Sequence, residues 1–276
     1  MHNTVLSYIP RDSVVHSLCG TTKLLFLLFF SFSTMLTYDT RVLLALAAIG
    51  IALFPISKIR VREVRAVIYF TLAFLTVNMI LLYIFSPDYG TEIYGTRTLL
   101  VKLFWRYDLT LEELFYLFNF ALKYLSMIPV AILFISCTNP SEFASSLNSI
   151  GISYKVGYAV SLALRYIPDI QYDYHNISTA QQARGVELGK GEKLWTRIKN
   201  AATILLPLIL SSLQRIDVIS DAMELRGFGK NRGRTWYIRR PFRTRDWVGM
   251  GLAVLIFALS LLITYWDGQR YFNPFV

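Results

Sequence analysis

The sequence is poor in charged residues, cysteine and histidine. Charged side chains make up 17% of its 276 residues, whereas a soluble domain usually has about 25%. Together with the 54% of hydrophobic residues, this deficit indicates a membrane protein. The two cysteines, Cys19 and Cys137, lie far apart in apolar stretches, so we expect neither a disulfide framework nor a C-x-x-C redox pair.

The motifs of catalytic and metal sites are missing as well. The three histidines, His2, His16 and His175, are too scattered to predict a metal site. The chain has no H-E-x-x-H, no G-x-S-x-G and no phosphate-binding G-x-x-x-x-G-K-S/T. A membrane-embedded enzyme would need such groups near the bilayer, so we predict no catalytic residue, no cofactor site and no metal site in this chain.

Five apolar segments are candidates for membrane-spanning helices. They are residues 23–38, 42–57, 66–86, 114–138 and 247–266. A bilayer requires about 20 apolar residues, and the first two segments are shorter, so we expect them to form a membrane hairpin. The last segment begins with Trp247 and ends with Trp266, where membrane proteins have an aromatic belt.

Basic residues predict the orientation of these segments. Lys58, Arg60, Arg62 and Arg65 follow the second segment, and the positive-inside rule places such a linker in the cytoplasm. The N-terminus is then cytoplasmic, and the C-terminus, after five spans, is outside. The stretch 87–113 contains turn residues and alternates weakly, so we expect an external hairpin or interfacial piece there.

The chain is expected to comprise three regions. They are membrane-spanning helices in 1–138, cytoplasmic helices in 139–245, and a final membrane helix with a C-terminal tail in 246–276. The middle region is the most basic, since residues 141–245 hold 16 of the 28 Lys and Arg and only 8 acidic residues. In a soluble protein the net charge of +10 would suggest nucleic acid. Cytoplasmic loops explain it here, so we predict no nucleic-acid partner.

The middle region has apolar stretches that are too short or too interrupted to predict spans. They are residues 156–168 and 201–213. Arg165 and Arg215 lie within or beside them, and a charge at the bilayer centre costs roughly 2.5–3.5 kcal/mol or more. We therefore expect long amphipathic helices at the cytoplasmic face, bent or broken at Pro168 and Pro207. The last helix is predicted to have an apolar face of Ile209, Leu213, Ile216, Ile219 and Met223 and a polar face of Ser211, Gln214, Asp217, Asp221 and Glu224.

Two helical runs of this region end in the same dipeptide. The stretches "AQQARGVELG" (180–189) and "AMELRGFGK" (222–230) both contain Arg-Gly. Glycine is favoured just past a helix end, and a cation in the last turn gains roughly 0.3–1 kcal/mol from the helix dipole. Helix capping alone therefore explains the dipeptide. The alternative is docking, because an arginine at a helix tip presents a rigid charged fork to a carboxylate on another protein.

Several stretches of the chain resemble the T component of energy-coupling factor (ECF) transporters, a family of vitamin and cobalt or nickel importers. They are "GTTKLLFLLFF" (20–30), "TNPSEFASSLNSIGIS" (138–153), "LALRYIPDI" (162–170), "ISTAQQARG" (177–185) and "LLPLILSSLQRIDVISDAMELRGFG" (205–229). The paired signature of the family is Ala-Arg-Gly, and the second copy here has leucine in place of alanine. The resemblance implies an all-α fold of polytopic membrane helices plus long amphipathic cytoplasmic coupling helices.

The resemblance also implies a function, which is that of a coupling and scaffold subunit rather than an enzyme. Two cytoplasmic ATP-binding cassette ATPases would bind ATP and Mg²⁺ and hydrolyse ATP. A small membrane S component would bind the vitamin or metal ion, in the lipid bilayer of a prokaryotic cell membrane. The implied ATPase-docking residues are Ala183, Arg184, Gly185, Leu225, Arg226 and Gly227.

One alternative is a permease subunit of an ordinary ATP-driven (ABC) importer that forms its own translocation path. Such a subunit would bind one ATPase through one cytoplasmic loop, and two docking signatures in one chain argue against it. Lys123, Asn78 and Asn119 are polar residues inside the predicted spans. Lys123 would contact the S component or extend its ammonium group to the membrane interface, while Asn78 and Asn119 are expected to form interhelical hydrogen bonds.

Overall fold

The computed structural model describes residues 8–104, 107–186, 194–230, 235–237, 240–266 and 271–275. Within these residues the chain forms ten helices and one two-stranded hairpin, so the predicted all-α fold is confirmed. It divides into two compact units. Unit 1 comprises Met1–Asn139 and Arg240–Val276, and unit 2 comprises Pro140–Arg239. This division reflects packing, and the three regions assigned by membrane location stay a prediction.

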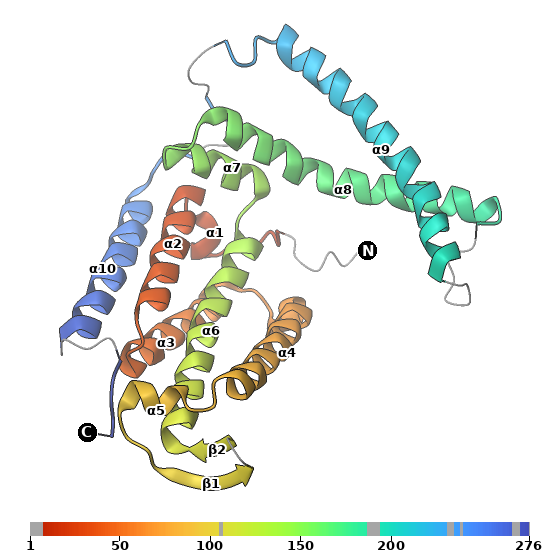
Figure 1. The fold of residues 1–276 in the computed structure, drawn as a ribbon. Helices are drawn as coiled ribbons and strands as arrows, with labels where there is room; N and C mark the ends of the chain where they lie inside the picture. The colour runs from red at the N-terminus through yellow and green to blue at the C-terminus, as the bar shows by residue number, and fades with distance from the viewer. Residues whose placement is uncertain are drawn as a thin grey trace. The chain divides into compact units, whose positions relative to one another are not determined.

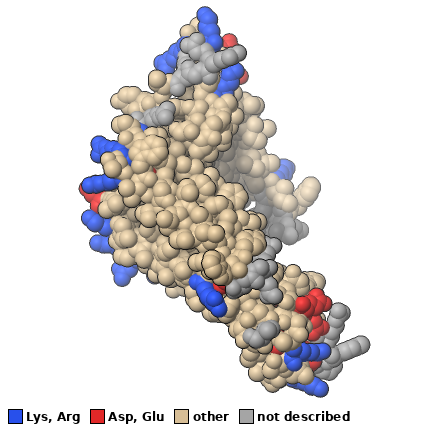
Figure 2. Space-filling view, turned by 90° about the vertical axis from the view of Figure 1, so that its left-hand side faces the viewer, with Lys and Arg blue, Asp and Glu red and all other residues tan. Residues whose placement is uncertain are grey.

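Unit 1 is a bundle of helices around α6. Its helices are α1 (Val14–Ser17), α2 (Gly20–Leu36), α3 (Thr40–Ser57), α4 (Val61–Phe85), α5 (Tyr89–Tyr94), α6 (Leu111–Cys137) and α10 (Thr244–Trp266). Helix α6 packs against α2, α3, α4 and α5, and α10 packs mainly against α2 (Figure 1). The face that carries α10 is a broad surface almost without charged side chains in Figure 2, as expected of a helix that contacts lipid.

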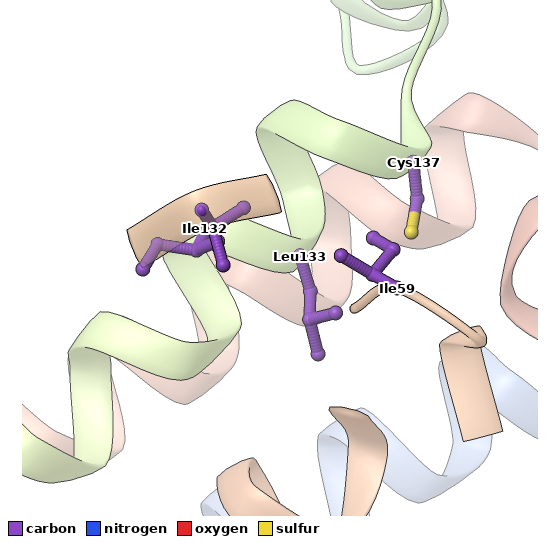
Figure 3. Close-up of a cluster of buried hydrophobic side chains, with 5 residues drawn as sticks. Ile59, Ile132, Leu133 and Cys137 are labelled. Carbon is purple, nitrogen blue, oxygen red and sulfur yellow. The ribbon is translucent and has the colours of Figure 1, made fainter. Parts of the chain in front are cut away.

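The interior of unit 1 contains two apolar clusters and many buried polar side chains. One cluster consists of Ile59, Val64, Ile132, Leu133 and Cys137, and it joins the end of α6 to the linker between α3 and α4 (Figure 3). Gly50 of α3 lies against α6, where an added Cβ would be 3.1 Å from the carbonyl oxygen of Ser126. The absence of a side chain therefore permits the close approach of these two helices.

The predicted external segment forms helix α5 and an antiparallel hairpin of β1 (Leu99–Phe104) and β2 (Tyr107–Thr110), which confirms the predicted hairpin. Two fully buried glutamates at the start of α6 hold it. The Glu112 carboxylate accepts hydrogen bonds from the backbone N–H and hydroxyl of Thr98, and Glu113 accepts one from the Gly90 N–H at 2.7 Å.

Five described helices are long and apolar enough to cross a membrane. They are Thr40–Ser57, Val61–Phe85, Leu111–Cys137, Ile198–Leu225 and Thr244–Trp266. Four of them match predicted spans. The predicted span 23–38 falls mostly in α2, which has only 17 residues. The Ile198–Leu225 helix was expected as an amphipathic cytoplasmic helix rather than as a span. It is long and apolar enough to cross a membrane because it continues through Pro207, and its cytoplasmic location stays a prediction.

Unit 2 consists of three helices, α7 (Pro140–Ser149), α8 (Tyr154–Ala183) and α9 (Leu194–Leu225). Helices α8 and α9 cross, and their C-terminal ends lie at opposite ends of the pair (Figure 1). Pro168 and Pro207 lie inside these helices, which continue through both residues. Of the predicted bend or break at each proline, the break does not occur. The predicted apolar face of α9 is largely uncovered by the described residues, since Ile209, Leu213 and Ile216 are all exposed.

The predictions for asparagines in the spans were half right. Asn119 joins helices as expected, because its Oδ1 accepts a hydrogen bond from the Thr40 hydroxyl of α3 at 2.7 Å. Asn78 instead donates to the Phe74 carbonyl of its own helix at 2.8 Å, so the interhelical bond predicted for it was wrong.

Lys123 forms contacts that neither sequence interpretation included. Its ammonium group donates a hydrogen bond to the Met35 carbonyl at the end of α2, at 3.0 Å. The same group lies 3.4 Å from the centre of the Tyr38 ring. A cation over an aromatic face is stabilised by the ring quadrupole, so Lys123 fastens the end of α2 within unit 1.

Candidate functional site

The first Arg-Gly dipeptide ends α8 in a Schellman motif. Arg184 is the last residue of the turn, and Gly185 has a φ of +86°. The Gly185 N–H donates to the Gln182 carbonyl at 2.9 Å, and the Val186 N–H donates to the Gln181 carbonyl at 3.0 Å. These two bonds satisfy carbonyls that the helix leaves unpaired, and the left-handed backbone explains the glycine.

The second dipeptide ends α9 with the same geometry. Gly227 has a φ of +65°. Its N–H donates to the Glu224 carbonyl at 2.8 Å, and the Phe228 N–H donates to the Met223 carbonyl at 2.9 Å. The two ends therefore use the same pair of bonds at the same offsets, and helix capping accounts for glycine at both positions.

Capping does not account for the residues that precede each glycine. Ala183, Arg184 and Arg226 are exposed, and Leu225 is 89% exposed. A Cβ atom built on either glycine would meet nothing within 4 Å, so the need for glycine inside this chain comes from φ rather than from crowding. Each end thus has an exposed arginine beside an exposed apolar or small residue.

The two ends lie far apart in unit 2. Phe228, just after the second dipeptide, contacts the rings of Tyr154 and Tyr158 in the first two turns of α8, at 5.7 and 4.9 Å between ring centres. The first dipeptide lies at the other end of this 30-residue helix. At 1.5 Å per residue, the two arginines are separated by about 40 Å, so a single narrow groove could not hold both.

An ion pair joins the crossing helices between these ends. Arg215 of α9 contacts the carboxylate of Asp173 on α8 at 2.5 Å and that of Asp169 at 3.9 Å. Its guanidinium also lies 5.8 Å from the centre of the Tyr166 ring. The sequence interpretation treated Arg215 only as a charge unsuited to a span and missed this role. The spacing of the two aspartates by four residues on one helix face was the available signal.

An apolar hollow of about 380 Å³ lies beside this ion pair, between α8 and α9. Its lining includes Leu162, Ile170, Ile219 and Met223. Only Ile204 and Leu208 of α9 are buried apolar side chains among the described residues of that helix. The crossing is therefore held at a few points, and most of its apolar surface is open.

The described residues contain no group of three or more His, Cys, Asp or Glu that could hold a metal ion. His16 and His175 belong to different units, and His2 lies outside the residues that the structure describes. Cys19 and Cys137 are both buried free thiols.

Residues 11–237 match the family model described as CbiQ, cobalt transport protein, and this range contains both Arg-Gly ends. Several similar proteins are named energy-coupling factor transporter transmembrane protein EcfT. The one from Lactococcus lactis subsp. cremoris is 29% identical over 277 residues, which cover 97% of this chain and 99% of the relative. The one from Staphylococcus aureus is 23% identical over 94% of this chain and 96% of its own length. The one from Streptococcus equi subsp. equi is 25% identical over 90% and 92%.

Proposed function

This chain belongs to the cobalt transport protein (CbiQ) family and is a T component of an ECF transporter, and we propose that it links two cytoplasmic ATPases to a substrate-binding membrane protein. It is a bacterial multi-pass membrane protein and a coupling subunit rather than an enzyme. The observation that carries the proposal is the pair of helix ends with the same backbone geometry and exposed arginines, separated by the length of α8.

Two similar ends suit two similar partners. Each end holds an arginine at a tip whose backbone is fixed by two hydrogen bonds, so little conformational entropy is lost on docking. A guanidinium forms a bidentate pair with a carboxylate. We therefore assign one ATP-binding cassette ATPase to Ala183-Arg184-Gly185 and one to Leu225-Arg226-Gly227, each docking through an acidic residue. ATP and Mg²⁺ would bind to the ATPases, and the purified chain alone would hydrolyse no ATP.

The exposed apolar side chains of α8 and α9 suit a membrane partner. Ile209, Leu213 and Ile216 are 51–59% exposed, and a soluble monomer rarely exposes a large contiguous apolar patch. In the proposal these helices lie at the cytoplasmic face, because Arg215, Asp217 and Asp221 make a span through the bilayer centre costly. They would contact a small S component, which selects the vitamin or metal ion. The N-terminus would be cytoplasmic.

A permease subunit with its own translocation path is the competing function. It would dock one ATPase for each chain and pair with a second permease. The repeated helix end supports the T component instead, because a single coupling loop would have no use for a second exposed arginine about 40 Å away.

The test uses Arg184→Ala, Arg226→Ala and the double variant in the complete complex purified from membranes. Truncating one partner of a buried charge-assisted pair costs roughly 2–5 kcal/mol, so each single variant should retain one ATPase and the double variant none. Arg165→Ala is the matched control, because Arg165 is also an exposed arginine of α8. A double variant that keeps both ATPases would overturn the docking role and leave only helix capping.

A further inference from the structure

The chain passes between the two units at two points. It leaves unit 1 after Asn139 and returns at Arg240. Any movement of unit 2 that is carried along the backbone reaches unit 1 at these points. The contacts that hold residues 137 and 240–246 inside unit 1 therefore determine which helices of unit 1 respond.

A buried lysine holds the exit point. Lys23, in the first turn of α2, is 6% exposed. Its ammonium group donates to the Cys137 carbonyl at 3.0 Å and to the His16 carbonyl at 3.4 Å. Cys137 is the last residue of α6 and is buried against Ile59 and Leu133 (Figure 3). The last carbonyls of a helix lack partners within it, so the lysine satisfies the very end of α6.

A buried carboxylate holds the return point. Asp246, in the first turn of α10, is 2% exposed. Its Oδ1 accepts hydrogen bonds from the Cys19 N–H at 2.6 Å and from the Thr22 hydroxyl at 3.2 Å. Its Oδ2 accepts one from the Arg243 N–H at 2.8 Å. One carboxylate thus caps the N-terminal ends of both α2 and α10.

The residues that hold the two connections share one hydrogen-bond acceptor, the backbone carbonyl of His16. The His16 carbonyl accepts from Lys23 and also from the Arg240 guanidinium, at 3.4 Å in each case. One turn past Asp246, a Cβ on Gly249 would lie 2.9 Å from the Thr22 methyl group, so α10 and α2 are in close contact at this point. The first turn of α2 is therefore bound to both chain connections.

We propose that the first turn of α2 is a clamp on both connections, and that Lys23 and Asp246 are positioning residues that pass movements of unit 2 into the membrane helices. This inference rests on the proposed function, since it concerns how ATP-driven movement of α8 and α9 reaches unit 1. Both clamp residues bind groups of this chain. Lys23 donates to backbone carbonyls, and Asp246 accepts from backbone N–H groups.

Burying a charged side chain carries a desolvation cost, so a buried charge is a poor means of stabilising a fold. A whole buried ion pair replaced by apolar residues of similar volume often leaves stability unchanged or higher, whereas removal of a single partner destabilises. Lys23→Met keeps the length of the side chain and removes the ammonium group, and Asp246→Asn keeps one acceptor oxygen. The two variants are expected to insert and to retain both ATPases. Lys23→Met loses its bonds at the exit point, and Asp246→Asn loses one of its two acceptor oxygens at the return point.

The test is hydrogen exchange of the complete transporter complex, with and without ATP, which requires no knowledge of the substrate. In the unsubstituted protein, ATP should change exchange in α8 and α9 and also in residues 9–23 and 240–246. In both variants the change in unit 2 should remain. The change in unit 1 should be lost in Lys23→Met and weakened in Asp246→Asn. Lys23→Arg should restore part of it.

The matched control is Lys123→Met, because Lys123 also donates to a helix-end carbonyl of unit 1 at 3.0 Å but lies on neither connection. An unchanged response of unit 1 in Lys23→Met would overturn the clamp. Loss of the ATPases from that variant, or equal loosening of residues 9–23 with and without ATP, would reduce the lysine to a structural role and also overturn it. If ATP changes nothing in α8 and α9 of the unsubstituted complex, the proposed function fails instead.

Discussion

Leu43 of α3 and Leu213 of α9 are both leucines in apolar helices, but Leu43 is fully buried and the side chain of Leu213 is 51% exposed. The contrast holds between the centre of unit 1, around α3 and α6, and α9 of unit 2, while α4 of unit 1 is as open as α9. Unit 1 has apolar clusters and many buried polar side chains in its interior. Unit 2 has two long crossing helices with most apolar side chains open. A unit that packs on itself suits a scaffold, and a unit that leaves its apolar face open suits an element completed by partners.

The largest expected difference between the units is the cost of removing a leucine side chain. Leu43→Ala leaves a cavity in unit 1 and should destabilise the protein by about 2–5 kcal/mol. Leu213→Ala removes an exposed side chain and should cost no more than about 0.5 kcal/mol in the isolated chain. Unfolding of the two purified variants in detergent measures both values. Equal destabilisation would mean that unit 2 has a core of its own.

Replacement of the glycine should destabilise the protein by a similar amount at the two Arg-Gly ends. Gly185→Ala and Gly227→Ala force a Cβ into a left-handed backbone and should each cost roughly 1–2 kcal/mol. The control is Gly251→Ala in α10, which also meets nothing within 4 Å but has no positive φ. That change should stabilise by up to about 1 kcal/mol, as alanine does in a helix. Thermal unfolding distinguishes the two classes, and no loss at Gly185 and Gly227 would contradict the capping geometry.

The crossing of α8 and α9 should depend only modestly on its ion pair. The side chains of Arg215 and Asp173 are 36% and 26% exposed, so solvent weakens their attraction. A double-mutant cycle of Arg215→Ala and Asp173→Ala should give a coupling energy of about 0.5–1 kcal/mol. A value near zero would show that the apolar contacts around Ile204 alone fix the crossing.

The smallest expected effect is the pH dependence of stability that His16, in the N-terminal segment of unit 1, contributes. Burial lowers the pKa of His16 below its ordinary value, and the positive charges of Lys23 and Arg11 lower that pKa further, while Asp12 and a hydrogen bond to the Ile9 carbonyl oppose them. The Arg240 guanidinium faces the same residue through the His16 carbonyl. The unfolded chain therefore takes up the proton more readily than the folded chain.

The sign follows from this difference in proton affinity. The stability that neutral His16 contributes is fully present above pH of about 6.5 and is lost as the pH falls below it. His16→Gln should flatten this slope of unfolding free energy against pH, whereas His175→Gln on the exposed surface of α8 should keep it. An identical slope in His16→Gln and the unsubstituted protein would contradict the assignment.

Local patterns in the sequence predicted what depends on local physics. Four apolar segments became helices long enough to span, and Gly185 and Gly227 cap helices as their type predicts. The apolar stretch 201–213 of α9 was judged too short or too interrupted to span, and Pro207 was expected to bend or break the helix. A proline removes one hydrogen bond and bends a helix, but tertiary contacts can keep it continuous. That outcome depends on neighbours that a local pattern does not contain.

Contacts between distant residues could not be predicted. Cys19 and Asp246 are 227 residues apart, and no periodicity or motif pairs an N–H in one helix with a carboxylate in another. The exposure of Leu225 could not be predicted either, because the sequence does not show whether a leucine at the end of an apolar helix is buried or exposed. The candidate docking residues were therefore named from the resemblance, and their surroundings came from the structure.

The most direct test of the account is photo-crosslinking from the two helix ends. A crosslinking amino acid would replace Ala183 in one variant and Leu225 in another, since both side chains are exposed beside the arginines. The account predicts that each position captures an ATPase in the intact complex, and that a chain carrying both captures two. Capture of an ATPase at only one position, or of a membrane protein at both, would contradict the claim that each Arg-Gly end docks one ATPase.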